Sequence, residues 1–146
     1  MLLKSLKGES RILHSYVLTR EDKAVFFGII GRGSKSYDGA LSATCDTKEL
    51  LANIENSIKN SKYYEEIRLI VSVGISERLA EDLWKHLNLP ILVLDEKKYT
   101  VKYYQGIHKR FKELIYKQYI RLGGISTLRF LGKVVNEVYN LMVINK

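Results

Sequence analysis

The sequence has few of the residues that cross-link or interrupt a chain. Its 146 residues include one cysteine, Cys45, so an intramolecular disulfide is excluded, and no Cys/His cluster has the spacing of a zinc site. The one proline is Pro90, and no linker, low-complexity tract or internal repeat divides the chain. These absences predict a single domain over residues 1–146 in a reducing compartment, the cytoplasm.

Long hydrophobic runs are also missing. The longest apolar stretch, Ala24 to Ile30, is far shorter than the about 20 residues that cross a bilayer, and Met1 to Lys4 lack the apolar core of a signal peptide. Hydrophobic residues make up 46% of the chain and charged residues 27%, which excludes a disordered protein. We expect a folded protein with its own hydrophobic core and no membrane partner.

Acidic residues are scarce in the last third of the chain. The net charge is +8, and residues 97–146 hold 11 Lys and Arg against 2 Asp and Glu, whereas residues 1–96 hold 13 against 14. Cations interleaved with aromatic residues are typical of surfaces that contact phosphates and stack on bases. We predict a surface here for DNA or RNA. Its members are Lys97, Lys98, Lys102, Lys109, Arg110, Lys112, Lys117, Tyr119 and Arg121. The alternative is a solvated lysine-rich face whose tyrosines are buried.

The first part of the chain is rich in strand patterns. Strands are expected at Arg11 to Leu18, Ala24 to Gly31 and Tyr37 to Cys45. Turn residues at Thr19 to Asp22 and at Gly31 to Ser34 separate them, which predicts antiparallel pairing.

Helices and buried strands alternate in the middle of the chain. A helix that begins at Thr47 precedes an apolar strand at Ile67 to Val73, and a helix capped by Ser76 and stopped at Asn88 precedes the strand Ile91 to Leu94. This β-α-β-α-β order favours parallel strands with right-handed connections.

The pattern beyond Asp95 is weaker. Ile107, Phe111 and Ile115 predict a helix, and the alternation from Tyr116 to Leu122 predicts a strand on which Lys117, Tyr119 and Arg121 point the same way. A closing helix is expected from a cap at Ser126. Its apolar residues cover more than one face, which indicates deep burial or an oligomer contact. Beside the main stripe these are Val134, Tyr139, Leu141 and Ile144.

The order of elements predicts an α/β fold with a ribonuclease-H-like mixed sheet, in which three antiparallel strands are followed by alternating helices and parallel strands. Short segments in the same order carry a resemblance to a known family. They are Gly31-Arg32-Gly33, Tyr37 to Ser42, Arg68 to Val71 before Gly74-Ile75-Ser76, Asn88 to Val93, and Tyr119 to Ser126. The chain thereby resembles a divergent member of the archaeal family called domain of unknown function ninety-nine, which is similar to endonuclease V.

That resemblance implies divalent metal ions held by carboxylates at the ends of the first and fourth strands. The family carries Gly-Ile-Asp where this chain has His14-Ser15-Tyr16, and Leu-Asp-Gly where it has Ser72-Val73-Gly74. Endonuclease V has a glutamate near the position of Cys45, which is not a ligand for hard metal ions. We therefore predict a non-catalytic protein without a cofactor. Its former active-site cleft would hold Tyr16, Asp38, Val73 and Asp95.

Two other functions stay open from the sequence. A metal-dependent endonuclease with a rearranged acidic site would bind Mg²⁺ through Asp38, Asp46, Asp95 and Glu96, although Asp38 is better explained as the residue that holds the turn before its strand. A protein-interaction or homodimeric scaffold without nucleic-acid binding is the third hypothesis. For Cys45 we expect core packing rather than nucleophilic chemistry.

Overall fold

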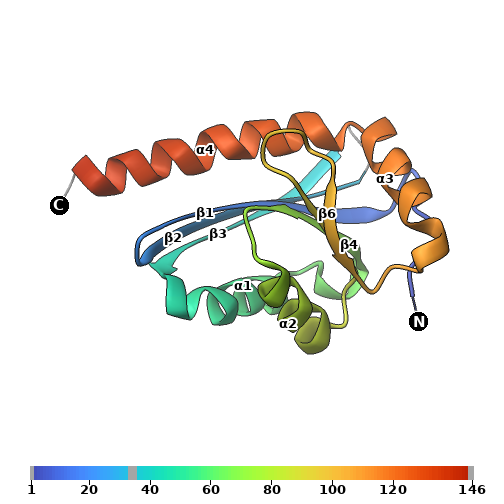
Figure 1. The fold of residues 1–146 in the computed structure, drawn as a ribbon, viewed down its shortest axis with the longest axis horizontal. Coiled ribbons are helices and arrows are strands. Elements are labelled where there is room, and N and C mark those ends of the chain that lie inside the picture. Colours follow the sequence, from blue (N-terminus) through green and yellow to red (C-terminus); the bar gives the residue numbers. More distant parts are fainter. Residues whose placement is uncertain (1, 33–35, 145–146) are drawn as a thin grey trace.

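The computed structural model describes residues 2–32 and 36–144, and its centre is a six-stranded mixed sheet (Figure 1). The strands are ordered β3-β2-β1-β4-β5-β6 across the sheet. Their bounds are β1 Arg11–Arg20, β2 Lys23–Arg32, β3 Ser36–Asp46, β4 Ile67–Val73, β5 Ile91–Leu94 and β6 Val101–Gln105. The predicted fold class, a ribonuclease-H-like mixed sheet, is confirmed.

The pairing of the strands follows the sequence pattern. Strands β1, β2 and β3 form an antiparallel meander, while β1, β4 and β5 run parallel at the centre. Strands β4 and β5 are buried over nearly their whole length, which is why they appear in the sequence as unbroken apolar runs. Gly33 and Ser34 of the second predicted turn lie outside the described residues.

Two helices cover one face of the sheet. Helix α1, Leu50–Lys59, follows a short 3₁₀ turn at Thr47–Glu49, and helix α2, Glu77–Leu87, begins after Ser76, whose hydroxyl accepts the backbone N–H of Leu79 at 3.1 Å. Asn88 ends α2 in a left-handed conformation, as its predicted role as a stop requires. Leu13, Phe26, Ile54, Ile58 and Leu83 are among the buried residues of this layer.

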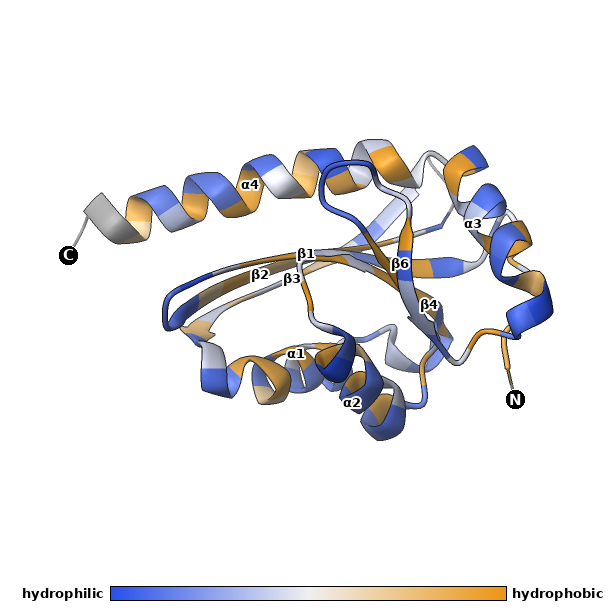
Figure 2. Cartoon of the chain, viewed as in Figure 1, coloured by the Kyte–Doolittle hydropathy of each residue, from blue (hydrophilic) through white to orange (hydrophobic). Residues whose placement is uncertain are grey.

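Helices α3, Lys112–Arg121, and α4, Gly124–Ile144, cover the other face (Figure 1). Ile12, Val71, Leu92, Ile115 and Leu128 are among the residues buried there. The strands between the two helical layers are mainly hydrophobic, whereas the tip of the β1–β2 hairpin is hydrophilic (Figure 2). None of the helices in the described part of the chain is long and apolar enough to cross a membrane.

Three expectations for the second half were wrong. Tyr116 to Leu122 is not a strand, because it lies in α3 and the turn after it. The helix expected from Ile107 begins only at Lys112. Ile107 itself follows the edge strand β6 and forms a β-bridge with Leu3. The last helix starts at Gly124 rather than after Ser126, and the side chain of Ile144 lies outside the description.

Candidate nucleic-acid interface and the cleft beside it

The strand ends that would hold metal ligands in the resembled family lie next to one another. Tyr16 of β1 pairs with Val73 of β4, Val73 pairs with Leu94 of β5, and Asp95 follows directly. A hollow of about 450 Å³ lies here between β1, the β5–β6 turn and α4. It is lined by Tyr16, Tyr99, Arg129, Gly132, Lys133, Asn136 and Glu137. Tyr16, Val73 and Asp95, three of the four predicted cleft residues, therefore lie close together at the end of the sheet where the parallel strands finish.

The phenol of Tyr16 occupies the sheet side of this hollow. A Cβ atom added to Gly132 of α4 would lie 2.9 Å from Cε2 of Tyr16, so the ring uses the space that a larger residue would fill. Burial, together with the nearby Tyr99 and Glu96, raises the pKa of Tyr16. Val73 is fully buried beneath the cleft. These two residues supply no oxygen anion, and so the donor set does not fit a divalent ion.

Asp38 is not a cleft residue, which corrects the prediction. It lies on β3 near the beginning of β1, and its carboxylate accepts hydrogen bonds from Arg11 at 2.9 Å and from Arg32 at 3.1 Å. The hydrogen bond from Arg11 is the main cause of its lowered pKa, and Arg32 adds to the effect. Asp38 therefore ties β1 and β2 to β3 through the two arginines.

The other candidate acids also have local partners. The carboxylate of Asp95 accepts the backbone N–H groups of Lys97 and Lys98 at 3.0 and 2.8 Å, which lowers its pKa, and Asp46 pairs with Lys23 at 2.6 Å. Three strands separate Asp46 on β3 from Asp95 after β5. Over residues 2–32 and 36–144, no group of three His, Cys, Asp or Glu side chains is placed to hold a metal ion.

The predicted cations of the last third lie on three elements. Lys97 and Lys98 lie in the β5–β6 turn, Lys102 on β6, and the others in or just before α3. The exposed ones are Lys97, Lys98, Lys102, Lys109, Arg110, Lys117 and Arg121. Among the described contacts of these predicted cations, the one ion pair is between Lys112 and Glu113, at 3.8 Å. We call these cations, together with Arg129 and Lys133 of α4, the basic face.

Four cations in the first two thirds form ion pairs with acids. Arg11 and Arg32 pair with Asp38, Lys23 pairs with Asp46, and Lys85 pairs with an acid one turn away on α2. Other exposed cations of this part, such as Lys48, Lys59 and Arg68, have no ion pair among the described residues. The basic face therefore differs from the rest of the protein in its local excess of positive charge, with 11 Lys and Arg against 2 Asp and Glu over residues 97–146.

Tyr99 joins the elements of the basic face. Its backbone carbonyl accepts the hydroxyl of Tyr116 of α3 at 2.6 Å, and the guanidinium of Arg129 of α4 lies 5.5 Å from its ring centre. Tyr99 itself adopts a left-handed backbone conformation, with φ of 57°. The β5–β6 turn is therefore held against both helices, and the cations around it share one framework.

Tyr119 does not belong to the interface, contrary to the prediction. On α3 it points into the core, where it is 0% exposed, and its hydroxyl donates to the carbonyl of Gly124 at 3.2 Å. Nδ1 of His14 lies 2.7 Å from the same oxygen, so the imidazole and the phenol share a hydrogen bond in the core. Burial raises the pKa of Tyr119 well above its usual value.

His14 is the polar centre of the core beneath the basic face. Burial lowers its pKa to about 4, and its Nε2 atom has no hydrogen-bond partner in the described structure. The sequence showed no partner for this histidine because Tyr119 lies 105 residues away. The imidazole is therefore a structural group that the fold keeps neutral.

Sequence reasoning missed Arg129 and Lys133 as members of this region. Arg129 and Lys133 are four residues apart, so they lie on the same flank of α4 and face the hollow. That spacing was visible in the sequence, but its relation to the β5–β6 turn depends on the packing of α4 across the sheet.

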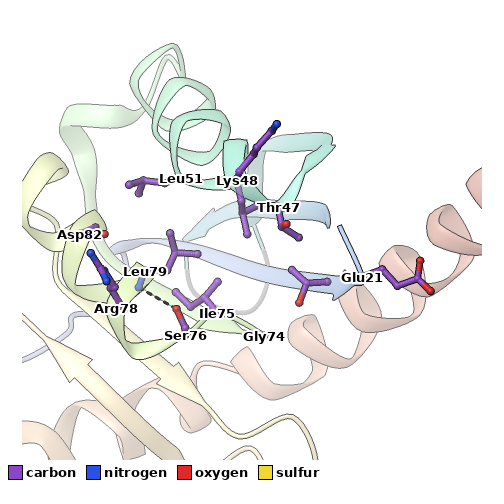
Figure 3. Close-up of a pocket in the computed structure, with 12 residues that line it drawn as sticks. Glu21, Thr47, Lys48, Leu51, Gly74, Ile75, Ser76, Arg78, Leu79 and Asp82 are labelled. Atoms are coloured by element: carbon purple, nitrogen blue, oxygen red, sulfur yellow. Dashed lines mark hydrogen bonds between the residues drawn. The ribbon is translucent and has the colours of Figure 1, made fainter. Parts of the chain in front are cut away.

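A second hollow, of about 520 Å³, lies at the same end of the sheet but between α1 and α2 (Figure 3). Leu51, Ile75 and Leu79 line it, and Lys48 and Arg78 are among its charged residues. Its acids Glu21 and Asp82 accompany these cations, so it lacks the one-sided charge of the basic face.

Comparisons with known proteins agree with the fold. No family model and no curated protein matches the sequence. Among solved structures, endonuclease V from Bacillus subtilis matches with a TM-score of 0.50 and 12% identity over 70% of this chain and 52% of that one. A protein of unknown function from Archaeoglobus fulgidus matches with a TM-score of 0.49 and 19% identity over 60% and 54% of the two chains. The chain thus spans about half the length of these structures.

The similarity to endonuclease V, together with the six-stranded mixed sheet, indicates an α/β protein with an endonuclease V-like fold. At this level of identity they speak for the arrangement of helices and strands, and the chemistry of the cleft has to be argued from its own residues.

Proposed function

We propose that this chain is a non-catalytic relative of the archaeal family of unknown function ninety-nine, and that it binds nucleic acid through the basic face. The observation that carries the proposal is the concentration of exposed cations on the β5–β6 turn, on β6 and in or just before α3, in a part of the chain that holds 11 Lys and Arg against 2 Asp and Glu. Phosphate groups are the complementary partners for such a surface, because each neutralised phosphate releases a condensed counterion.

Aromatic side chains among the cations support the same partner. The ammonium groups of Lys102 and Lys112 lie 5.4 Å from the ring centres of Tyr103 and Tyr104 on β6, and both rings are half-buried. A base can stack on such a ring while a neighbouring lysine contacts the backbone phosphate. Single-stranded DNA or RNA can present both groups at once.

The absence of catalysis follows from the cleft. Tyr16 and Val73 stand where carboxylates would bind Mg²⁺, while Asp38, Asp46 and Asp95 are engaged elsewhere. We expect no cleavage of single-stranded or inosine-containing nucleic acid with Mg²⁺ or Mn²⁺. Metal-dependent cleavage by the purified protein, abolished by chelation, would instead support the rearranged acidic site.

The binding proposal is tested by fluorescence anisotropy with labelled oligonucleotides of single- and double-stranded DNA and RNA. We expect the affinity to fall steeply between about 50 and 200 mM salt, as phosphate contacts require. Lys97→Glu/Lys98→Glu should weaken binding at least about 10-fold at low salt. The matched control is Lys48→Glu/Lys59→Glu, which makes the same charge change at exposed positions before and within α1. Equal losses in the two variants, or binding insensitive to salt, would contradict the proposal.

A further inference from the structure

The outer edge of β3 carries open backbone groups. A two-residue turn connects Arg20 of β1 to Lys23 of β2, and so these two residues form a hydrogen-bonded pair. From this pair onwards, hydrogen-bonded and non-hydrogen-bonded pairs alternate along the antiparallel strands. Even-numbered residues of β2 then bond to odd-numbered residues of β3 between positions 39 and 45. The N–H and C=O groups of Ala40, Ser42 and Thr44 therefore point away from β2. Among described residues, no other segment forms a backbone hydrogen bond to this edge.

Beyond the register shift beside Asp38, the segment Gly39–Cys45 of this edge lacks the features that usually prevent strand pairing. The segment Gly39–Cys45 contains no charged residue and no proline, and β3 is 11 residues long. The opposite edge, β6, has only five residues and carries Lys102. Of the two edges of the sheet, β3 is the one suited to accept another strand.

An exposed apolar flank of α4 lies on the side of β3. The hydroxyl of Thr127 is 3.0 Å from the hydroxyl of Tyr37 on β3, which orients this flank of the helix. Phe130, Val134 and Leu141 follow Thr127 by 3, 7 and 14 residues and so share its flank. Phe130 is 57% exposed and Leu141 is 56% exposed. The partner that covers them has to be apolar as well as able to pair with a strand.

A second copy of this chain meets both requirements. Its own β3 offers the same open edge, its own α4 the same apolar flank, and antiparallel pairing of a strand with itself is two-fold symmetric. The basic residues of the β5–β6 turn and β6 lie at the other edge of the sheet, and the neutral segment of β3 adds no repulsion. Electrostatics thus favours association through β3 over association through the basic face.

We propose that β3 pairs antiparallel with β3 of a second copy, with the two-fold axis at Ser42, so that two sheets join into one and the exposed flanks of α4 are covered. In this register Ser42 faces Ser42 of the partner subunit, and Ala40 faces the partner's Thr44. The three outward residues of each strand then make about six backbone hydrogen bonds across the axis, two for each hydrogen-bonded pair.

The mass in solution tests the proposal directly. Light scattering on the purified full chain at about 50 µM should give twice the monomer mass, since a stable interface of this kind associates at micromolar concentration. Ser42→Lys places two ammonium groups on the axis and should yield monomers with an unchanged circular dichroism spectrum. The control Ser42→Thr keeps a neutral strand-forming residue there and should stay dimeric.

Two further variants keep the test decisive. Phe130→Ser/Leu141→Ser should weaken association at least about 10-fold without touching β3. Ser42→Cys, made in a Cys45→Ser chain, should form a covalent dimer on mild oxidation, because the two Cα atoms would be about 5.5 Å apart. A monomeric wild-type chain at 50 µM, or a Ser42→Lys chain as dimeric as the wild type, would overturn the proposal.

Discussion

The ring of Tyr16 on β1 packs against the backbone of Gly132 in the middle of α4, where an added Cβ would come within 2.9 Å of Cε2. A glycine inside a helix costs about 1 kcal/mol relative to alanine, so its presence at this point calls for a packing reason. The reason is the phenol, which fills the place beneath α4 at the end of β1. Tyr16 and Gly132 are therefore a matched pair across the cleft.

A double-mutant cycle tests this pairing. In the wild type, Gly132→Ala should give no stabilisation, because the helix gain is offset by the clash with Tyr16. In a Tyr16→Ala background the same change should stabilise the protein by about 1 kcal/mol, as in an unhindered helix. The measurement is the free energy of urea unfolding for all four proteins. Equal effects of Gly132→Ala in both backgrounds would show that the two residues are independent.

Gly124 makes a closer contact with a more deeply buried ring. A Cβ atom there would lie 2.1 to 2.4 Å from three atoms of Tyr119, which is fully buried and cannot move aside without disturbing His14. We expect Gly124→Ala to destabilise the protein by about 1–3 kcal/mol through overpacking. Gly8→Ala is the control, since an added Cβ at Gly8 meets nothing within 4 Å. Thermal unfolding of the two variants should separate them clearly.

The buried imidazole predicts a pH dependence of stability. The pKa of His14 is lowered to about 4 in the folded protein. Between about pH 6.5 and 4 this histidine is therefore protonated in the unfolded chain but stays neutral in the folded one. The free energy of unfolding therefore decreases as the pH falls through this window, by about 3 kcal/mol over the whole of it. Above about pH 7.5 the residue is neutral in both states and contributes no such dependence.

His14→Gln provides the comparison. Glutamine can still donate a hydrogen bond to Tyr119, but it does not titrate. The difference in unfolding free energy between the wild type and this variant should thus change between pH 7.5 and 4.5, to the disadvantage of the wild type at low pH. A difference that stays constant with pH would mean that His14 titrates normally in the folded protein.

Asp38 and Asp46 provide a contrast between two ion pairs on one strand. The Asp38 side chain is 10% exposed and contacts two arginines, whereas that of Asp46 is 38% exposed and contacts one lysine. We expect Asp38→Asn to lower the midpoint of urea unfolding clearly and Asp46→Asn to change it little, because exposed ion pairs are screened by solvent. The loss in Asp38→Asn should also shrink at low pH, where the wild-type carboxylate is protonated. A larger loss for Asp46→Asn would refute this ranking.

The sequence predicted the sheet because the residues that build it carry local signals. The apolar run Ile67 to Val73, the Ser76 cap and the stop at Asn88 each depend on neighbours in the chain, and the structure confirms all three. Strand β6 was not predicted because it is a short edge strand, and its sequence Val-Lys-Tyr-Tyr-Gln shows no clear buried face.

The candidate site was harder to predict because it depends on distant contacts. Residues 116–122 alternate like a strand, but Ile115 and Tyr119 also repeat at helical spacing, and the bond to His14 decides which face is buried. Likewise, nothing near Asp38 in the sequence shows that Arg11 would reach it from another strand. That Tyr16 and Val73 lie side by side could be expected, because the first and fourth strands pair in parallel in the predicted fold.

Cys45 has a practical consequence for following the motions of β3. It is the one thiol of the chain, it lies half-buried on the inner face of β3, and burial raises its pKa. Its reaction with a thiol-specific label is slowed by this packing and becomes faster when the strand separates from its cover. The rate of labelling therefore reports local opening at this edge without any engineered probe.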